Sequence, residues 1–195
     1  MDQPGSRKPA PAPLHLIQDL ANSFDLEGGR ESLVGLHDLD AFARSHGMDG
    51  VRFSLEDLDR VRLLRDALRE CCIANAGHES DASRFRFLND TFARAAMSLV
   101  IASDAAPALV ATDPRSGFDL LATHVQDAIY RADAQGIWPR LKACESEVCR
   151  WVYYDNSPSG RSRWCTMSVC GSRAKMRAYR ARTDRSRLGS ATAST

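Results

Sequence analysis

The sequence lacks the segments by which proteins enter or cross membranes. Residues 1–11 hold no apolar core of signal-peptide length, and no run approaches the roughly 20 apolar residues that cross a bilayer. We therefore expect a soluble, cytoplasmic protein without membrane contact. In a reducing compartment, the six cysteines are more typical of thiols or metal ligands than of disulfides.

Signatures of catalysis are missing as well. The chain has no glycine-rich loop for a phosphate, no nucleophile elbow and no His-Glu-x-x-His pair. Asp19 with Asn22, or Asp38 with Asp40, could form acid–base pairs, but solvated helix charges and caps explain such residues more often. We expect no enzyme.

Most of the chain has the apolar spacing of α-helices. Proline-rich residues 1–13 predict a disordered leader. Beyond them, apolar spacing and capping residues predict helices near residues 14–24, 32–46, 54–76, 81–95 and 116–136. Two short apolar runs, at residues 99–102 and 109–111, predict one small β-hairpin. The fold class is therefore mainly α.

Four cysteines near the C-terminus form two matched pairs. Four residues separate Cys144 from Cys149 and Cys165 from Cys170, and fifteen residues lie between the pairs. Two such pairs can supply the four thiolates of a tetrahedral Zn²⁺ site. Four cysteines can also hold an iron–sulfur cluster, although the long aromatic loop between the pairs favours zinc. The ion would stabilise a segment too short to build a core of its own.

The loop between the cysteine pairs has the composition of a second hairpin. Residues 150–157 are aromatic and β-prone, and residues 158–160 are turn formers. We expect this hairpin to place both cysteine pairs on one side, with Trp151, Tyr153 and Trp164 as a minimal core.

Charge is divided unevenly along the chain. Residues 1–139 carry 14 Lys and Arg against 21 Asp and Glu, a net charge of −7, whereas residues 140–195 carry 12 against 4, a net charge of +8. Such asymmetry points to nucleic-acid contact or an interaction tail. Some of the cations could serve only to balance the negative charge of four thiolates around Zn²⁺.

The cations continue past the last cysteine at helical spacing. One helical face holds Arg173, Arg177, Arg180 and Arg187, and another holds Ala174, Ala178 and Ala181. We expect the arginines to meet phosphates while the alanines pack on the zinc-binding segment. The predicted DNA contacts are Arg161, Arg163, Arg173, Lys175, Arg177, Arg180 and Arg182.

The residues around the four cysteines match the motifs of a known family. Its motifs are Cys144-x4-Cys149, Trp151, Asp155-x-Ser157, Arg163-Trp164-Cys165-x-Met167 and Cys170-Gly171-Ser172-Arg173-Ala174-Lys175. The segment resembles the CGNR-type zinc finger, a module usually found behind an ABATE domain in proteins regarded as stress-induced transcriptional regulators. Upstream, Asp19-Leu20-Ala21-Asn22-Ser23 is similar to the opening element of the ABATE domain.

The resemblance spans most of residues 14–183 and implies a domain order. A helical ABATE-like domain (14–139) would precede the CGNR-type finger with its basic helix (140–187), followed by a disordered tail (188–195). One position departs from the motif, because Ser172 stands where the family has Asn. If that Asn fixes the turn after the last ligand, Ser would do so less well, since Asn tolerates left-handed backbone better.

Two functions from different classes fit these features. The first is a zinc-dependent DNA-binding transcriptional regulator, whose acidic N-terminal domain senses a small molecule or protein signal and could form a homodimer. The alternative is a protein-interaction module in which Trp151, Tyr153 and Tyr154 form an exposed aromatic anchor. Burial of these aromatics against the helical domain would decide against the alternative.

Two minor candidates remain. Cys71 and Cys72 lie in the apolar pattern of a helix, which predicts core packing rather than a redox role. His15 and Asp19 are four residues apart and could share a helix face, but no third ligand is evident in the sequence. We therefore do not expect a second metal site.

Overall fold

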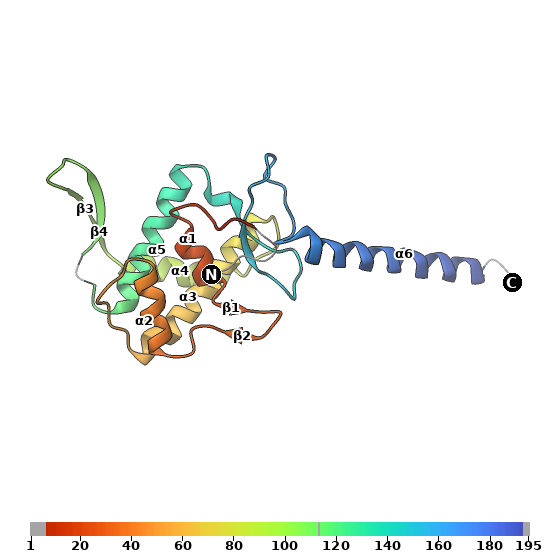
Figure 1. The fold of residues 1–195 in the computed structure, drawn as a ribbon, viewed down its shortest axis with the longest axis horizontal. Coiled ribbons are helices and arrows are strands. Elements are labelled where there is room, and N and C mark those ends of the chain that lie inside the picture. The colour runs from red at the N-terminus through yellow and green to blue at the C-terminus, as the bar shows by residue number, and fades with distance from the viewer. Residues whose placement is uncertain (1–6, 113, 193–195) are drawn as a thin grey trace.

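The computed structural model describes residues 7–112 and 114–192, with side chains as far as residue 183. Helices α1 to α5 form a compact body, from which the β3–β4 hairpin and helix α6 project in opposite directions (Figure 1). The helices are α1 (His15–Ala21), α2 (Leu36–Ser45), α3 (Leu55–Asn75), α4 (Ala82–Arg94), α5 (Gly117–Ala134) and α6 (Ser172–Thr192). Among the described residues, none of these helices is long and apolar enough to span a membrane.

The strands form three antiparallel pairs over the described ranges. They are β1 (Phe24–Asp25) with β2 (Arg30–Glu31), β3 (Met97–Ile101) with β4 (Pro107–Ala111), and β5 (Leu141–Ala143) with β6 (Val152–Tyr154). The mainly α fold and the β3–β4 hairpin confirm the prediction from sequence. The β1–β2 hairpin in the same domain was not predicted, because strands of two residues show no periodicity.

Side-chain caps set the starts of three helices where the sequence predicted them. Ser54 and Asp57 form a reciprocal capping box at α3, with N–H to oxygen distances of 2.9 and 3.1 Å. Asp81 caps α4, and the hydroxyl of Ser116 caps α5 by accepting from the Asp119 N–H. These local signals explain why the helix starts could be predicted.

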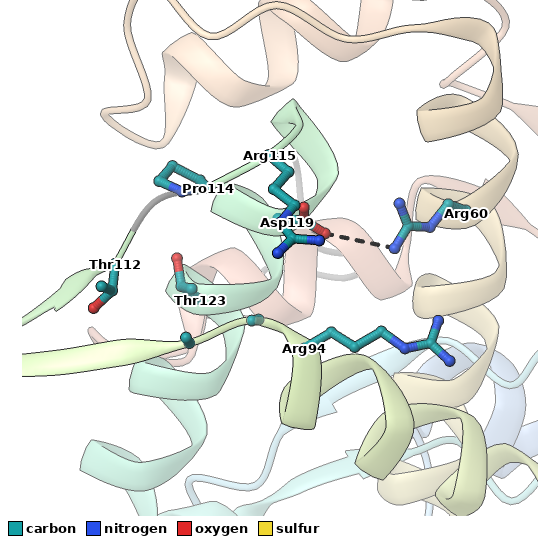
Figure 2. A pocket seen from close by; sticks show the side chains of 9 residues that line it. Arg60, Arg94, Thr112, Pro114, Arg115, Asp119 and Thr123 are labelled. Atoms are coloured by element: carbon teal, nitrogen blue, oxygen red, sulfur yellow. Dashed lines mark ion pairs between the residues drawn. The ribbon is translucent and has the colours of Figure 1, made fainter.

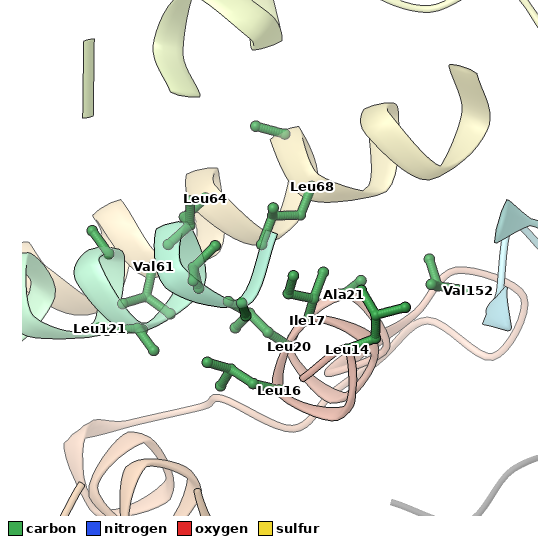
Figure 3. Packing of buried hydrophobic residues seen from close by; sticks show 14 of the residues in the cluster. Leu14, Leu16, Ile17, Leu20, Ala21, Val61, Leu64, Leu68, Leu121 and Val152 are labelled. Atoms are coloured by element: carbon green, nitrogen blue, oxygen red, sulfur yellow. The ribbon is translucent and has the colours of Figure 1, made fainter. Parts of the chain in front are cut away.

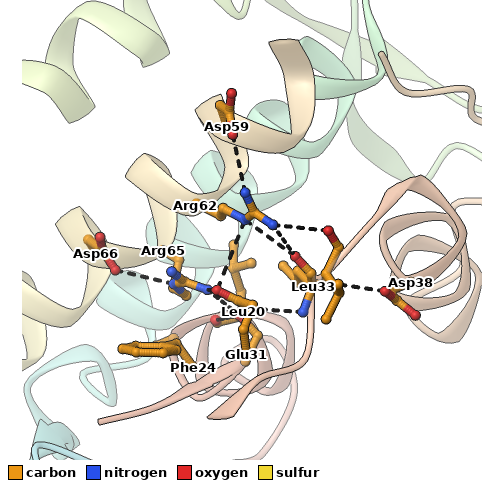
Figure 4. Close-up of polar contacts among 12 residues, drawn as sticks. Leu20, Phe24, Glu31, Leu33, Asp38, Asp59, Arg62, Arg65 and Asp66 are labelled. Carbon is orange, nitrogen blue, oxygen red and sulfur yellow. Dashed lines mark hydrogen bonds and ion pairs between the residues drawn. The ribbon is translucent and has the colours of Figure 1, made fainter. Parts of the chain in front are cut away.

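Helix α2 begins at Leu36, four residues later than predicted. The preceding segment continues from β2 in an extended path, and Leu33 is buried there rather than on a helix. Arg62 of α3 holds this segment by donating to the Leu33 carbonyl at 2.8 Å, and Arg65 donates to the Glu31 carboxylate at 2.7 and 2.8 Å (Figure 4). These tertiary contacts keep the segment extended.

The core lies where α1 crosses α3 and α5. Leu16, Ile17 and Leu20 of α1 face Val61, Leu64 and Leu68 of α3 and Leu121 of α5 (Figure 3). The same buried cluster continues into β5 and β6 of the cysteine module through Leu141, Ala143, Val152 and Tyr154. The helical domain and the cysteine module therefore share one hydrophobic core.

Both predicted disordered ends are partly ordered. Residues 7–13 of the leader follow the protein surface, and the Ala10 N–H donates to the Gln18 side chain at 2.7 Å. Helix α6 runs to Thr192, so residues 188–192 are helical in the structure, where the sequence predicted a disordered tail. Residues 1–6 and 193–195 lie outside the described part.

Candidate metal centre and basic helix

The four cysteines predicted as metal ligands meet in one buried cluster. Cys144 and Cys149 come from the loop that joins β5 to β6. Cys165 lies two residues before a π-helical turn (Met167–Gly171), and Cys170 lies within that turn. The Cys165 Sγ lies 3.7 Å from that of Cys149 and 3.6 Å from that of Cys170, and all four sulfurs lie within 4.8 Å of one another. Bonds of about 2.3 Å to a tetrahedral Zn²⁺ separate the sulfurs by about 3.8 Å. The cluster therefore fits Zn²⁺ with no position left for substrate.

Crowding separates the pKa values of these thiols. Hydrogen bonds from Cys149 and Cys165 lower the pKa of Cys144 to about 2, and backbone N–H groups of Cys165 and Ser146 add to this effect. The Cys144 thiolate in turn raises the pKa of Cys149 to about 12 and that of Cys165 further. Four thiolates can coexist here only around a cation, which Zn²⁺ would supply.

The hairpin of the cysteine module differs from the predicted one. β6 pairs with β5, which precedes the first cysteine pair, rather than with the segment before Cys165. The first pair lies in the connecting loop, where the Ser146 carbonyl accepts from the N–H groups of Cys149 and Arg150 at 2.9 Å. Arg150 has a φ of 45°, a left-handed conformation that completes this tight turn.

The turn after the last ligand is held by local packing and one hydroxyl. A Cβ at Gly171 would lie 2.8 Å from Met167 Sδ and 3.3 Å from Trp164 Cδ1, so a larger residue would force these side chains apart. Ser172 donates its hydroxyl to the Met167 carbonyl at 3.1 Å. Its φ of −65° lies in the right-handed helical region. The backbone at this position therefore does not need a residue, such as Asn, that tolerates the left-handed conformation.

Asp155 of the Asp-x-Ser motif organises the loop between the cysteine pairs. Its buried carboxylate accepts from Lys142 Nζ at 3.1 Å, from the Ser157 N–H at 3.0 Å and from the Ser162 N–H at 2.8 Å. Burial alone would raise the pKa of Asp155, but these hydrogen bonds hold it well below its usual range. The motif is thus a structural clamp.

The predicted aromatic core of the module is confirmed. Tyr153 is fully buried and donates its hydroxyl to the Ser162 carbonyl at 2.6 Å, and Trp151 and Trp164 pack half-buried against the cysteine cluster. Tyr154 is buried in the shared core. The interaction-module hypothesis predicted that these aromatic side chains form an exposed anchor. For both tyrosines this prediction is wrong, because they are buried.

Arg7 was missed by sequence reasoning. Its guanidinium lies 4.3 Å from the centre of the Tyr153 ring and donates to the Trp164 carbonyl at 2.6 Å and to the Cys165 carbonyl. One arginine in a proline-rich segment gives no signal of such a role. The contact ties the leader to the ligand-bearing loop.

Helix α6 presents a row of arginines. Arg173, Arg177 and Arg180 line one shallow groove together with Ser168, Val169, Ser172 and Met176, which confirms the predicted helical face. The alanines do not pack on the finger as expected. Ala174 is half-buried, whereas Ala178 and Ala181 are exposed, because the helix projects away from the body after its first turn (Figure 1). Arg187 lies beyond the described side chains.

The predicted DNA-contact residues fall into two groups. Arg163 pairs with Glu145, and Arg173 pairs with Glu27 in the turn between β1 and β2. All seven side chains are exposed. Of these, Arg161, Lys175, Arg177 and Arg180 have no acidic partner in the described part of the chain.

The N-terminal domain contains an open pocket of about 380 Å³ (Figure 2). Among its described lining residues are Arg60, Arg94, Arg115, Asp119 and Thr123. Arg60 pairs with Asp119 at 3.5 Å, whereas neither Arg94 nor Arg115 has an acidic partner among the residues that the structure describes. The pocket is therefore positively charged at its described wall.

The two other candidate cysteines behave as predicted. Cys72 is fully buried and Cys71 is half-buried, and burial raises the pKa of Cys71 to about 11. A thiol with a raised pKa is a poor nucleophile at neutral pH, which favours packing over redox chemistry.

Comparison with known families gives two matches. Residues 140–183 match the family model of the CGNR zinc finger, and residues 14–133 match that of the ABATE domain, described as "Putative stress-induced transcription regulator". The second match alone covers more than half of the chain. No curated protein matches the chain.

Proposed function

The chain belongs to the ABATE family and carries a CGNR zinc finger, and from this premise we propose that it is a zinc-dependent DNA-binding regulator of transcription. The observation that carries the proposal is the row of exposed cations that begins directly behind the cysteine cluster. We assign DNA binding to residues 140–187 and sensing to residues 14–139. We assign no catalytic activity to either part, and we place the site of action in the cytoplasm.

The zinc centre would have a structural role rather than a catalytic one. We assign Cys144, Cys149, Cys165 and Cys170 as its ligands. Cys170 lies two residues before α6, so an ion at the cluster would anchor the start of that helix and fix its direction. Arg177 and Arg180 follow at a spacing that suits successive phosphate contacts, and Arg161 extends the cationic surface on the finger. Direct base reading would fall to Arg173, Lys175 or Arg177.

Arg173 offers a point of regulation within this surface. Its guanidinium pairs with Glu27, so contact with DNA would require exchange of a carboxylate for a phosphate. The side chains of both partners are about half-exposed, which makes such an exchange inexpensive. The β1–β2 turn of the sensing domain thereby competes with DNA for one of its contacts.

We assign a small-molecule signal to the arginine-lined pocket. Two guanidinium groups without acidic partners in the described chain, with Thr123 beside them, suit a small anion such as a carboxylate or phosphate. Titration with inorganic phosphate should raise the melting temperature of the protein but not that of an Arg94→Ala, Arg115→Ala variant. An equal response of both proteins would remove this assignment.

We assign homodimer formation to the β3–β4 hairpin. Its side chains include Leu99 and Ile101, which are 66% and 64% exposed, and neither strand contains a charged residue. Monomeric proteins usually protect such edges with charges or proline, and the two strands hold only one such residue, Pro107 at the start of β4. A second copy would place the same apolar edge opposite its own counterpart, as two-fold symmetry requires.

A mobility-shift assay tests DNA binding. The full chain should retard random-sequence duplexes at low salt, and reversal of charge at Arg177 and Arg180 should weaken this binding. Arg44 and Arg86 supply the matched control, because both are exposed on the N-terminal domain and their reversal changes the net charge equally. Absence of binding by the wild-type chain at low salt would contradict the proposal.

A further inference from the structure

A second cluster of potential metal ligands lies between α1 and α2. His15 and Asp19 are on α1, and His46 caps the C-terminal end of α2, 27 positions further along the chain than Asp19. The sequence suggested the first two residues but not the third, because only the packing of the two helices brings His46 to the site. One ligand atom from each of the three residues lies within 4.8 Å of the others.

The distances in this cluster match metal coordination better than hydrogen bonding. The Nε2 atoms of His15 and His46 lie 3.3 and 3.4 Å from the same oxygen, Asp19 Oδ2. Charge-assisted N–H···O bonds are shorter, at about 2.7–2.9 Å. Bonds of about 2.0–2.1 Å to a tetrahedral Zn²⁺ would separate nitrogen and oxygen ligands by about 3.3–3.4 Å.

The burial of the Asp19 and His46 side chains and the packing of Phe42 against His46 also suit an ion. The side chains of Asp19 and His46 are each only 8% exposed, and Phe42 packs against the His46 ring at 4.7 Å between centroids, which orients it. His15 is 48% exposed and forms the open side of the cluster.

We propose that His15, Asp19 and His46 form a second metal site, which binds Zn²⁺ or a similar divalent transition metal and leaves a fourth position open to solvent. Two imidazoles and one carboxylate are the donor set of many zinc sites that keep an exchangeable position. The ion would join the end of α2 to α1. Asn22, which caps the C-terminal end of α1, donates its side-chain amide to the Val152 carbonyl in β6 of the finger. Occupancy of the metal site would stabilise the attachment of the finger to the sensing domain.

Metal stoichiometry of the tag-free full chain tests this site. Equilibrium dialysis against micromolar Zn²⁺ should give two ions per wild-type chain, and one per chain for His46→Ala and for His15→Ala. His15 is the second variant because its half-exposed side chain contributes less to the core, so the variant should keep its fold. His37→Ala is the matched control: His37 is 89% exposed on α2, and this variant should retain two ions.

The melting temperature gives an independent readout. Zn²⁺ added beyond one equivalent should raise it for the wild type and for His37→Ala, but not for His15→Ala. One ion per wild-type chain, or two in both cluster variants, would overturn the second site. Neither result bears on DNA binding, which is measured separately, so the two proposals can fail independently.

Discussion

The side-chain amide of Asn22 forms hydrogen bonds with both backbone groups of Val152, as the backbone of a neighbouring strand would. The amide donates to the Val152 carbonyl at 2.7 Å and accepts from the Val152 N–H at 2.8 Å. All of these groups are buried, so the pair joins α1 to the free edge of β6 without exposing backbone polar groups. The Asp-Leu-Ala-Asn element that resembled the start of an ABATE domain therefore provides one attachment point of the finger.

Asn22→Ala tests this attachment. A buried backbone group left unpaired costs about 1–3 kcal/mol, and only the longer Gln18 contact at 3.3 Å would remain at the carbonyl. Urea denaturation should therefore show a loss of about 1–3 kcal/mol in the free energy of unfolding. Asn156→Ala, at an exposed position, should change it by less than about 0.5 kcal/mol. Equal effects would mean that the pairing contributes little.

Zinc binding should depend on each finger cysteine. We expect Cys149→Ser to lower the zinc content by one ion per chain in elemental analysis, because three thiolates bind far more weakly than four. Cys71→Ser should keep the full content, since Cys71 lies on α3 away from the cluster. Iron with a visible chromophore in the wild type would instead indicate an iron–sulfur cluster.

Asp155→Asn tests the clamp and its pH dependence. Removing one partner of a buried ion pair costs about 3–5 kcal/mol, and the Asn oxygen can still accept, so we expect the lower end of that range. The pKa of Asp155 is lowered on folding from its ordinary 3.8, so the contribution of its charge is complete above that value. It is lost only as pH falls through the lower folded pKa.

The stability difference between wild type and Asp155→Asn should thus be constant from about pH 5 to about pH 8 and should shrink in stronger acid. Asp133→Asn is the control, because Asp133 is exposed. A difference that changes steadily across neutral pH would contradict the assignment of a strongly ionised Asp155.

The hairpin assignment predicts a change of oligomeric state. Sedimentation velocity should find the wild type as a dimer at micromolar concentration and the Leu99→Lys, Ile101→Lys variant as a monomer, since lysine on an edge strand opposes pairing. Val34→Lys, a change at another exposed apolar residue, should leave the dimer intact. A monomeric wild type, or a dimer that survives both lysines, would contradict this interface.

Local signals made much of the fold predictable. The caps at Ser54, Asp81 and Ser116, and the spacing of the four cysteines, act within a few residues, so the sequence alone reveals them. Features that depend on distant contacts were missed. The pairing of β6 with β5 and the position of His46 beside Asp19 arise only once α1, α2 and the finger pack together.

The salt dependence of DNA affinity tests the central claim most directly. Each phosphate contact that releases a counterion adds about 0.9 to the slope of log affinity against log salt concentration. Reversing Arg177 and Arg180 should therefore reduce the magnitude of the slope by about 2, whereas reversal at Arg44 and Arg86 should leave it nearly unchanged. An equal slope for wild type and the Arg177, Arg180 variant would contradict a DNA-binding role for α6.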